Sequence, residues 1–413
     1  MRLLSLAVLL ASSVSLAHAA EPNYDESKVG DITLPAITTS DSVDQWENER
    51  RAEVLKLFQS EMYGKPYKFD KVEVVSISDK RPLPDADAYI QEVILMLDNQ
   101  RVSVVLQMPN ADAPVPVFVG YNFCGNHSVI TGDWIEVSKS WANPMVCGNQ
   151  VDPTRMTTKD NKFLPTSRSI REFRWPAQEI TARGYGLVTI YYGDVLPDDP
   201  AAFQEFMKVN LPEEDYKDYS AIGIWAAGLS AVADYLETRR DVDEDRMAVM
   251  GHSRLGKTAL WTGATDERFK YIISNNAGMG GNSLSRRNYG ETVDIITTQF
   301  PHWFTGSFRG YVGKENTLPI DQHMLMGLLA PRPVYVASAV DDQWADPKGE
   351  FLSLHNAKEV YALYTKDLFP ESEQPAVDSP VHSVLSYHYR TGPHNVRFYD
   401  WQNYLDIADK YFK

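Results

Sequence analysis

Basic residues are scarce in this sequence compared with acidic ones. The 413 residues include 40 Lys and Arg against 56 Asp and Glu, which gives a formal net charge of −16 at pH 7. Binding to nucleic acid needs a positively charged surface, so this balance argues against a nucleic-acid partner. The charge says little about the fold.

Long apolar runs are lacking beyond the first residues. The start of the chain has Arg2, an apolar core from Leu3 to Leu16, and Ala17-His18-Ala19 as a small-x-small cleavage site. This pattern predicts a secretory signal peptide over residues 1–19. Its apolar core is too short to span a membrane, and no later run approaches the length needed. We therefore expect an exported, soluble protein, secreted or periplasmic, with no membrane partner.

Cysteine is nearly absent, with only Cys124 and Cys147. In an oxidising compartment the two could form a disulfide that closes a short loop. Two buried free thiols fit the sequence equally well. The spacing resembles no metal site, and we expect neither a metal nor an organic cofactor.

Predicted strands and helices alternate along most of the chain. Length alone fits one elaborated α/β domain as well as two; we take residues 20–413 as a single catalytic domain. Apolar rather than alternating strands indicate a mostly parallel sheet covered on both sides by helices. The residues 131–173 and 278–318 lack periodicity and predict long loops that shape a cleft. The predicted strands are 71–78, 89–97, 102–108, 114–121, 186–192, 246–250, 271–275, 333–339 and 383–389, and the predicted helices are 42–62, 176–183, 221–238, 254–264, 351–364 and 401–412.

The segment around Ser253 has the pattern of a nucleophile elbow. Gly251-His252-Ser253 follows an apolar strand and directly precedes a predicted helix. A sharp strand-to-helix turn would expose the serine hydroxyl above a parallel sheet. The pattern departs from the usual G-x-S-x-G because Gly256 comes one residue late. Gly-x-Ser alone is common, but its place between strand and helix favours Ser253 as a nucleophile.

A serine nucleophile needs a base and a group that orients the base. The α/β-hydrolase order is Ser, then Asp or Glu, then His, on loops after later strands. His394 lies on the loop between the last predicted strand and the last helix, so it is the candidate base. Asp341, Asp342 and Asp346 share the loop after strand 333–339, and the distance from the strand slightly favours Asp342. Asp341 remains an alternative.

Two cations follow the candidate nucleophile. The backbone N–H of Arg254 is the expected oxyanion donor, and Lys257 lies one helical turn beyond Ser253 on the same face. Together they would hold a polar, oxygen-rich acyl group, whereas a lipase pocket would be apolar. Alternatively, both side chains pair with surface carboxylates.

Several separated segments together resemble the glucuronoyl esterases, carbohydrate esterase family fifteen, and in particular their bacterial branch. The matching stretches run through the chain from Pro114 to Phe412. They are Gly251-His252-Ser253-Arg254-Leu255-Gly256-Lys257, Ser283-Leu284-Ser285-Arg286-Arg287, Gly290-Glu291-Thr292-Val293, Phe300-Pro301-His302-Trp303-Phe304, Ala330-Pro331-Arg332-Pro333-Val334, Asp342-Gln343-Trp344-Ala345-Asp346-Pro347-Lys348-Gly349-Glu350 and Gly392-Pro393-His394.

The resemblance implies an α/β-hydrolase that cleaves esters between glucuronic acid side groups of xylan and lignin alcohols, so the partner would be a glucuronoxylan or lignin–carbohydrate ester. It implies Ser253 as nucleophile, His394 as base and the Arg254 guanidinium as a further oxyanion stabiliser. The side chains that it implies as holding the sugar hydroxyls are Lys257, Glu291, Trp344 and Gln299.

One position departs from the fungal members of the family. They carry a catalytic glutamate after the strand that follows the nucleophile helix, where this chain has Asn276. An amide cannot stabilise an imidazolium as a carboxylate does, so the acid role passes to Asp342, as in some bacterial relatives. Three other functions stay open: an esterase for acetylated xylan or simple esters, a serine peptidase of similar fold, and a carbohydrate-binding protein with an inactive triad.

Overall fold

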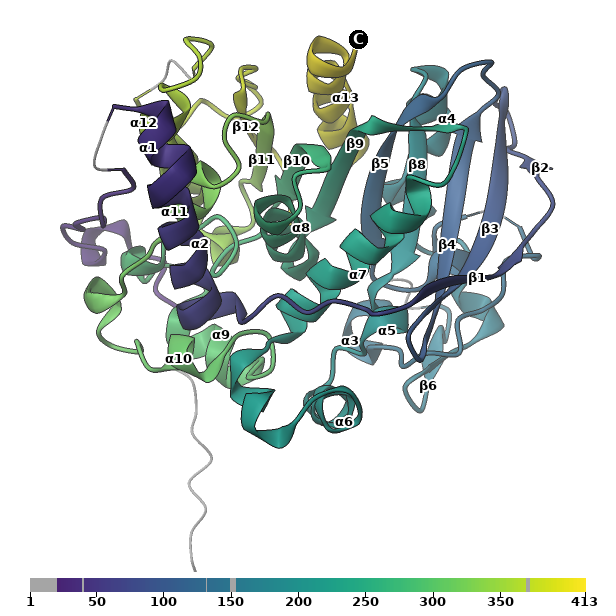
Figure 1. Cartoon of the computed structure of the whole chain (residues 1–413), viewed down its shortest axis with the longest axis horizontal. Coiled ribbons are helices and arrows are strands. Elements are labelled where there is room, and N and C mark those ends of the chain that lie inside the picture. The colour runs from purple at the N-terminus through teal and green to yellow at the C-terminus, as the bar shows by residue number, and fades with distance from the viewer. Residues whose placement is uncertain (1–20, 39–40, 131, 149–153, 369–371) are drawn as a thin grey trace, which may run out of the picture.

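A ten-stranded mixed sheet organises the protein, as a computed structural model shows (Figure 1). The structure describes residues 21–38, 41–130, 132–148, 154–368 and 372–413, so the predicted signal peptide lies outside the described residues. Within these ranges, no helix has the length and apolar character needed to cross a membrane.

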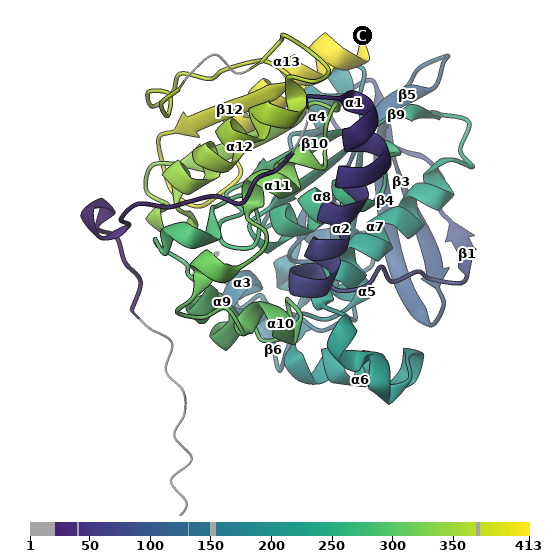
Figure 2. The ribbon, with the colours of Figure 1, turned by 60° about the vertical axis from the view of Figure 1, so that its left-hand side comes forward.

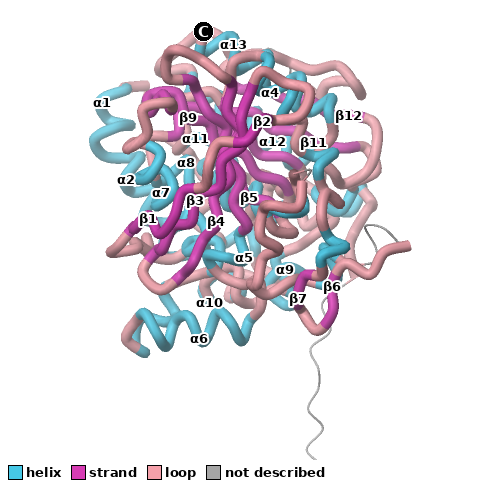
Figure 3. Tube along the Cα trace, turned by 90° about the vertical axis from the view of Figure 1, so that its right-hand side faces the viewer, coloured by secondary structure: helices cyan, strands magenta, loops and turns pink. Residues whose placement is uncertain are grey.

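The sheet is antiparallel at one end and parallel over the rest. β1 to β4 pair antiparallel with one another, β4 pairs antiparallel with β8, and the strands from β8 to β12 run parallel in the order β8-β5-β9-β10-β11-β12. Figure 3 views the molecule from the antiparallel end. The strands are β1 (Val72–Ile77), β2 (Arg81–Pro82), β3 (Ala88–Leu97), β4 (Gln100–Pro109), β5 (Val115–Asn122), β8 (Gly186–Tyr191), β9 (Val242–His252), β10 (Phe269–Asn275), β11 (Val334–Ala339) and β12 (Leu385–Arg390).

Helices cover both faces of the sheet, which confirms the predicted fold class. Met247 and Val249 of β9 belong to one buried apolar cluster, while the alternate residues Ala248 and Met250 belong to the other. Because both faces of the sheet are buried here, residues 247–250 of the strand form a continuous apolar run. The first cluster includes side chains of α2 (Arg51–Phe58), α7 (Ala221–Leu236), α8 (Arg254–Thr265), α11 (Gln322–Gly327) and α12 (Pro347–Tyr361), and the second includes those of α4 (Ala177–Ala182) and α13 (Phe398–Phe412).

The sequence-based prediction missed several helices. The stretch 278–318 contains α9 (Val293–Gln299) and α10 (Gly306–Arg309), and α6 (Pro200–Asn210) was not predicted at all. α9 and α10 have two turns or fewer, which gives too few apolar positions to show a helical period. α6 has 11 residues, and its start is marked by the Asp199 N-cap and by Pro200 in the first turn, signals that the prediction missed. For α9 the N-cap is the readable signal, because the Thr292 side chain accepts a hydrogen bond from Ile295 N–H.

The insertion between β5 and α4 is fastened by a disulfide. Cys124, just after β5, is bonded to Cys147 at the end of α3 (Pro144–Cys147). The pair is therefore a disulfide rather than two free thiols. The same insertion carries a two-stranded hairpin, β6 (Thr158–Lys159) and β7 (Lys162–Phe163), where the sequence predicts only a loop. The disulfide ties this insertion to the end of a central strand.

Candidate active site

Ser253 lies on a strained turn between β9 and α8. Its backbone has φ 57° and ψ −131°, an unusual conformation for a residue with a side chain. A Cβ on Gly251 would lie 1.9 Å from the Leu255 carbonyl oxygen, so only glycine fits there. A Cβ on Gly256 would approach Ala277 to 3.0 Å, so the late glycine lets α8 pack closely beside the end of β10. The turn is a nucleophile elbow in geometry.

His394 and Asp342 form a hydrogen-bonded pair beside Ser253. His394 Nδ1 lies 2.5 Å from Asp342 Oδ2, and Ser253, Asp342 and His394 line one cavity. The side chain of Asp342 is 3% exposed and that of His394 is 38% exposed. The Asn276 amide also donates to Asp342 Oδ2, at 2.8 Å. His252 packs 4.4 Å from the His394 ring, but burial lowers the pKa of His252 well below its usual range, so it stays neutral.

The three carboxylates of the loop after β11 have different environments. Asp341 is exposed. Asp346 accepts from Arg287 Nε at 2.8 Å and caps α12 through Gly349 N–H at 3.0 Å. Of these three carboxylates, only Asp342 is hydrogen-bonded to His394.

The Arg254 guanidinium is held by a buried carboxylate that sequence reasoning missed. Asp198, on the loop between α5 (Tyr192–Val195) and α6, pairs with Arg254 Nη1 and accepts from His302 Nε2 at 2.8 Å and from Trp303 Nε1 at 2.7 Å. Burial alone would raise the pKa of Asp198, but the Arg254 charge and these hydrogen bonds hold it below its usual range. Arg254 also lies 4.6 Å from the Trp303 ring and 5.3 Å from that of Phe300.

Lys257 and Glu291 form a buried ion pair on the wall of the same cavity. Lys257 Nζ donates to Glu291 Oε2 at 3.1 Å and to the Ala277 carbonyl at 2.7 Å, and both charged side chains are nearly fully buried. Burial lowers the pKa of Lys257, and the Glu291 carboxylate opposes this effect. An ammonium has three N–H donors, so one can still bind a ligand hydroxyl. Within the described part of the chain, Arg254 and Lys257 pair with the buried Asp198 and Glu291 and with no surface carboxylate.

The cavity has a volume of about 310 Å³, within the range of small-molecule sites. Trp344 and Gln299 also line it, so every predicted site residue lies at this one place. Glu291 N–H donates to the Trp344 carbonyl at 2.8 Å, which joins the two loops that carry these side chains. The remaining lining residues are Asn276, Ala277, Gly278, Phe300, Trp303 and Ala345.

The N-terminal segment supports the Glu291 loop. The Asn23 carbonyl accepts from Gly290 N–H at 2.8 Å, and Glu26 pairs with Arg287 at 2.5 Å and with Lys348 at 3.2 Å. Figure 2 shows this purple segment on the side of the molecule that carries α11 and α12. No local sequence pattern predicts this contact, because the partners lie more than 260 residues apart.

Glu350 is a buried carboxyl behind the cavity wall. It accepts from Gly278 N–H at 2.9 Å and from the Ser338 hydroxyl at 2.5 Å. Burial raises the pKa of Glu350 from 4.5 to about 8, with smaller contributions from the charges of Asp342 and Asp346.

The raised pKa of Glu350 predicts that the stability of the folded protein depends on pH. Between pH 4.5 and about 8, folded Glu350 keeps a proton that the unfolded chain has released, so stability falls as pH rises through this window. The slope from this group is on the order of 1 kcal/mol per pH unit. Glu350→Gln removes the titration, so denaturant unfolding at pH 5 and pH 8 should show a clearly smaller loss for this variant. An equal loss of stability in Glu350→Gln and in the wild type would contradict the assignment of this pH dependence to Glu350.

Known proteins similar to this chain are esterases. Residues 213–365 match a family model described as glucuronyl esterase, fungi. Over 405 residues the chain is 39% identical to carbohydrate esterase MZ0003 from an unknown prokaryotic organism, covering 94% of this chain and 91% of that protein.

Two solved structures are similar over nearly the whole chain. One, described as a promiscuous CE15 esterase from a marine bacterial metagenome, has a TM-score of 0.85 and 39% identity, covering 94% of this chain and 99% of that one. The other, a glucuronoyl esterase from Solibacter usitatus, has a TM-score of 0.83 and 37% identity, covering 93% and 99%. The chain therefore belongs to carbohydrate esterase family 15, the glucuronoyl esterases, which are carboxylic ester hydrolases with an α/β-hydrolase fold.

Proposed function

We propose that this protein hydrolyses esters between glucuronic acid side groups of xylan and lignin alcohols, and that Ser253, His394 and Asp342 carry the reaction. The observation that supports this most is the buried Lys257–Glu291 pair beside Ser253, because it offers donors and acceptors for sugar hydroxyls within reach of a nucleophile. A simple apolar acyl group would leave these buried charges without a matching ligand.

In the first half of the reaction, His394 Nε2 takes the hydroxyl proton of Ser253 as Oγ attacks the ester carbonyl carbon. The carbonyl oxygen becomes an oxyanion, which the Arg254 backbone N–H and guanidinium stabilise, with a further donor from the loop after β5. The bond to the alcohol oxygen then breaks, and this oxygen takes the proton from His394. Asp342 holds the imidazole in place and stabilises its charged form.

In the second half, water replaces the alcohol. His394 takes a proton from the water as its oxygen attacks the acyl carbon, and returns the proton to Ser253 Oγ as the acyl bond breaks. Glucuronate leaves the cavity. The Asn276 amide, which donates to Asp342, orients this carboxylate towards His394.

We further propose that the protein is exported and meets its substrate outside the cytoplasm. The support is the signal-peptide pattern of residues 1–19 and the disulfide between Cys124 and Cys147.

Substrate preference tests the proposal. Benzyl glucuronate should be hydrolysed with a kcat/KM at least about tenfold above that of benzyl acetate, because only the first ester offers hydroxyls to Lys257 and Glu291. Lys257→Met should remove most of this difference and leave the acetate rate near that of the wild type. A wild-type protein that prefers the acetyl ester would instead support a general or acetyl-xylan esterase, the second candidate, since one similar protein is described as promiscuous.

Arg254→Met tests the oxyanion role. We expect kcat for benzyl glucuronate to fall by about 10²- to 10³-fold, because one charged donor to the transition state is lost while the backbone N–H remains. Steady-state kinetics and a thermal unfolding curve would be compared for the variant and the wild type. An unchanged kcat with a raised KM would mean that Arg254 only binds substrate.

A further inference from the structure

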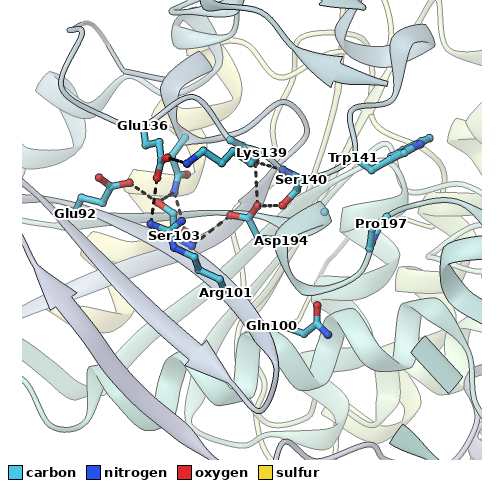
Figure 4. A pocket seen from close by; sticks show the side chains of 13 residues that line it. Glu92, Gln100, Arg101, Ser103, Glu136, Lys139, Ser140, Trp141, Asp194 and Pro197 are labelled. Atoms are coloured by element: carbon cyan, nitrogen blue, oxygen red, sulfur yellow. Dashed lines mark hydrogen bonds and ion pairs between the residues drawn. The ribbon is translucent and has the colours of Figure 1, made fainter. Parts of the chain in front are cut away.

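A second cavity, of about 520 Å³, lies beside the segment that follows β8, which consists of α5 and the loop after it (Figure 4). The Tyr192 hydroxyl of α5 donates to Asp198 of this loop, and Asp198 holds Arg254, which lines the active-site cavity. Asp194 of α5 and Pro197 of the loop line the second cavity. One short segment therefore contributes to the second cavity and holds a side chain of the first, and the proposed mechanism assigns no role to the side chains that line the second cavity.

The floor of this cavity is a network of carboxylates and hydroxyls. Asp194 accepts from Ser140 at 2.6 Å and from Ser138 at 3.1 Å, and Glu92 accepts from Ser103 at 2.7 Å. Burial raises the pKa of Asp194 to about 6, while its hydrogen bonds lower it. Hydroxyls and carboxylates together supply both donors and acceptors, which suits a ligand rich in hydroxyl groups.

The charges at the rim nearly cancel. Arg101 and Lys139 both pair with Glu136, at 3.1 and 2.5 Å. With Glu92 and Asp194 on the floor, the cavity carries two cations against three carboxyl groups, one of which titrates near neutral pH. Such a balance gives no strong preference for an anion or a cation, so it favours an uncharged ligand.

Trp141 supplies an apolar surface on the cavity wall. Its carbonyl accepts from the Tyr191 hydroxyl at 2.6 Å, which fixes the backbone. Among the described residues, the indole has no hydrogen-bond partner and no ring contact, and it packs against neither apolar cluster. Figure 4 shows it at the edge of the cavity, beside Pro197. A partly buried tryptophan without such contacts offers its face to a ligand.

We infer that this cavity binds an uncharged segment of a polysaccharide chain, with Trp141 stacking on a sugar ring and the Asp194 and Glu92 network binding its hydroxyls. This inference rests on the proposed function. Under that function, the bound polysaccharide segment is the neutral xylose backbone of the substrate. The cavity would then hold part of the polymer while a glucuronate ester occupies the site beside Ser253.

The test uses xylohexaose, a neutral oligosaccharide that carries no ester, and the full-length protein. Calorimetric titration should show binding to the wild type, weakened by about tenfold or more in Trp141→Ala and largely retained in Trp141→Phe. The matched control is Trp134→Ala. This tryptophan lies in the same insertion but packs beneath Arg81 and against the second apolar cluster, outside the cavity.

Kinetics with benzyl glucuronate separate this inference from the proposed function, because that substrate has no polysaccharide chain. Trp141-dependent binding of xylohexaose supports the second site even if benzyl glucuronate is not hydrolysed. Binding that is absent in the wild type, or equal in wild type and Trp141→Ala, overturns the inference whatever the esterase activity. Equal weakening in Trp134→Ala and Trp141→Ala also overturns it.

Discussion

Ser253→Ala is expected to lower kcat for benzyl glucuronate by about six orders of magnitude, to the limit of detection. In the proposed mechanism this residue supplies the oxygen that forms the acyl-enzyme, and removal of a serine nucleophile from a comparable triad has an effect of about this size. Alanine keeps the backbone geometry of the elbow, so the protein should fold and bind substrate as before. Release of benzyl alcohol, followed with the wild type in parallel, measures the effect.

A labelling experiment provides the control for this variant. A fluorophosphonate should modify the wild type once, at Ser253, and should leave Ser253→Ala unlabelled, as mass spectrometry of the intact protein and its peptides would show. Labelling at another serine, or substantial turnover by the variant, would mean that the elbow serine is not the nucleophile.

Asp342→Asn is expected to lower kcat by about 10⁴-fold. The carboxylate holds His394 through Nδ1 at 2.5 Å, and an amide there can neither stabilise the imidazolium nor fix the tautomer. KM should change little, because the proposed sugar contacts are made by other side chains. Steady-state kinetics of the variant and the wild type, measured side by side, would give the loss.

The neighbouring residue offers a matched control. Asp341→Asn makes the same chemical change one position earlier, on an exposed side chain that contacts neither the histidine nor the cavity. It should leave kcat within about twofold of the wild type. Similar losses in both variants would indicate a general effect of charge on this loop rather than a triad acid at position 342.

The central sheet, and the residues Ser253, Asp342 and His394 that the structure brings to one cavity, could be predicted from the sequence because each leaves a local signal. Nine predicted strands match nine strands of the sheet, with β9 extended at its start. Ser253 follows a glycine at a strand end, and His394 lies between the last strand and the last helix. These patterns involve neighbours along the chain, which a sequence displays directly.

The contacts that hold the site side chains in place could not be predicted, because they join residues far apart in the chain. Asp198 holds Arg254 from 56 residues away, and the Asn23 carbonyl accepts a hydrogen bond from Gly290 N–H on a loop far along the chain. The choice between Asp341 and Asp342 also needed coordinates, since adjacent carboxylates on a loop point in different directions. Asn276 stands where fungal relatives have a glutamate, and its amide donates to Asp342. The sequence shows the residue type at this position but not this contact.

A crystal structure of Ser253→Ala with methyl glucuronate bound is the most direct test of the account. We predict that the sugar fills the cavity beside residue 253, with hydroxyls on Lys257 and Glu291 and the ester carbonyl oxygen directed at the Arg254 backbone N–H. A sugar bound elsewhere, or one whose carbonyl oxygen points away from Arg254, would contradict the account.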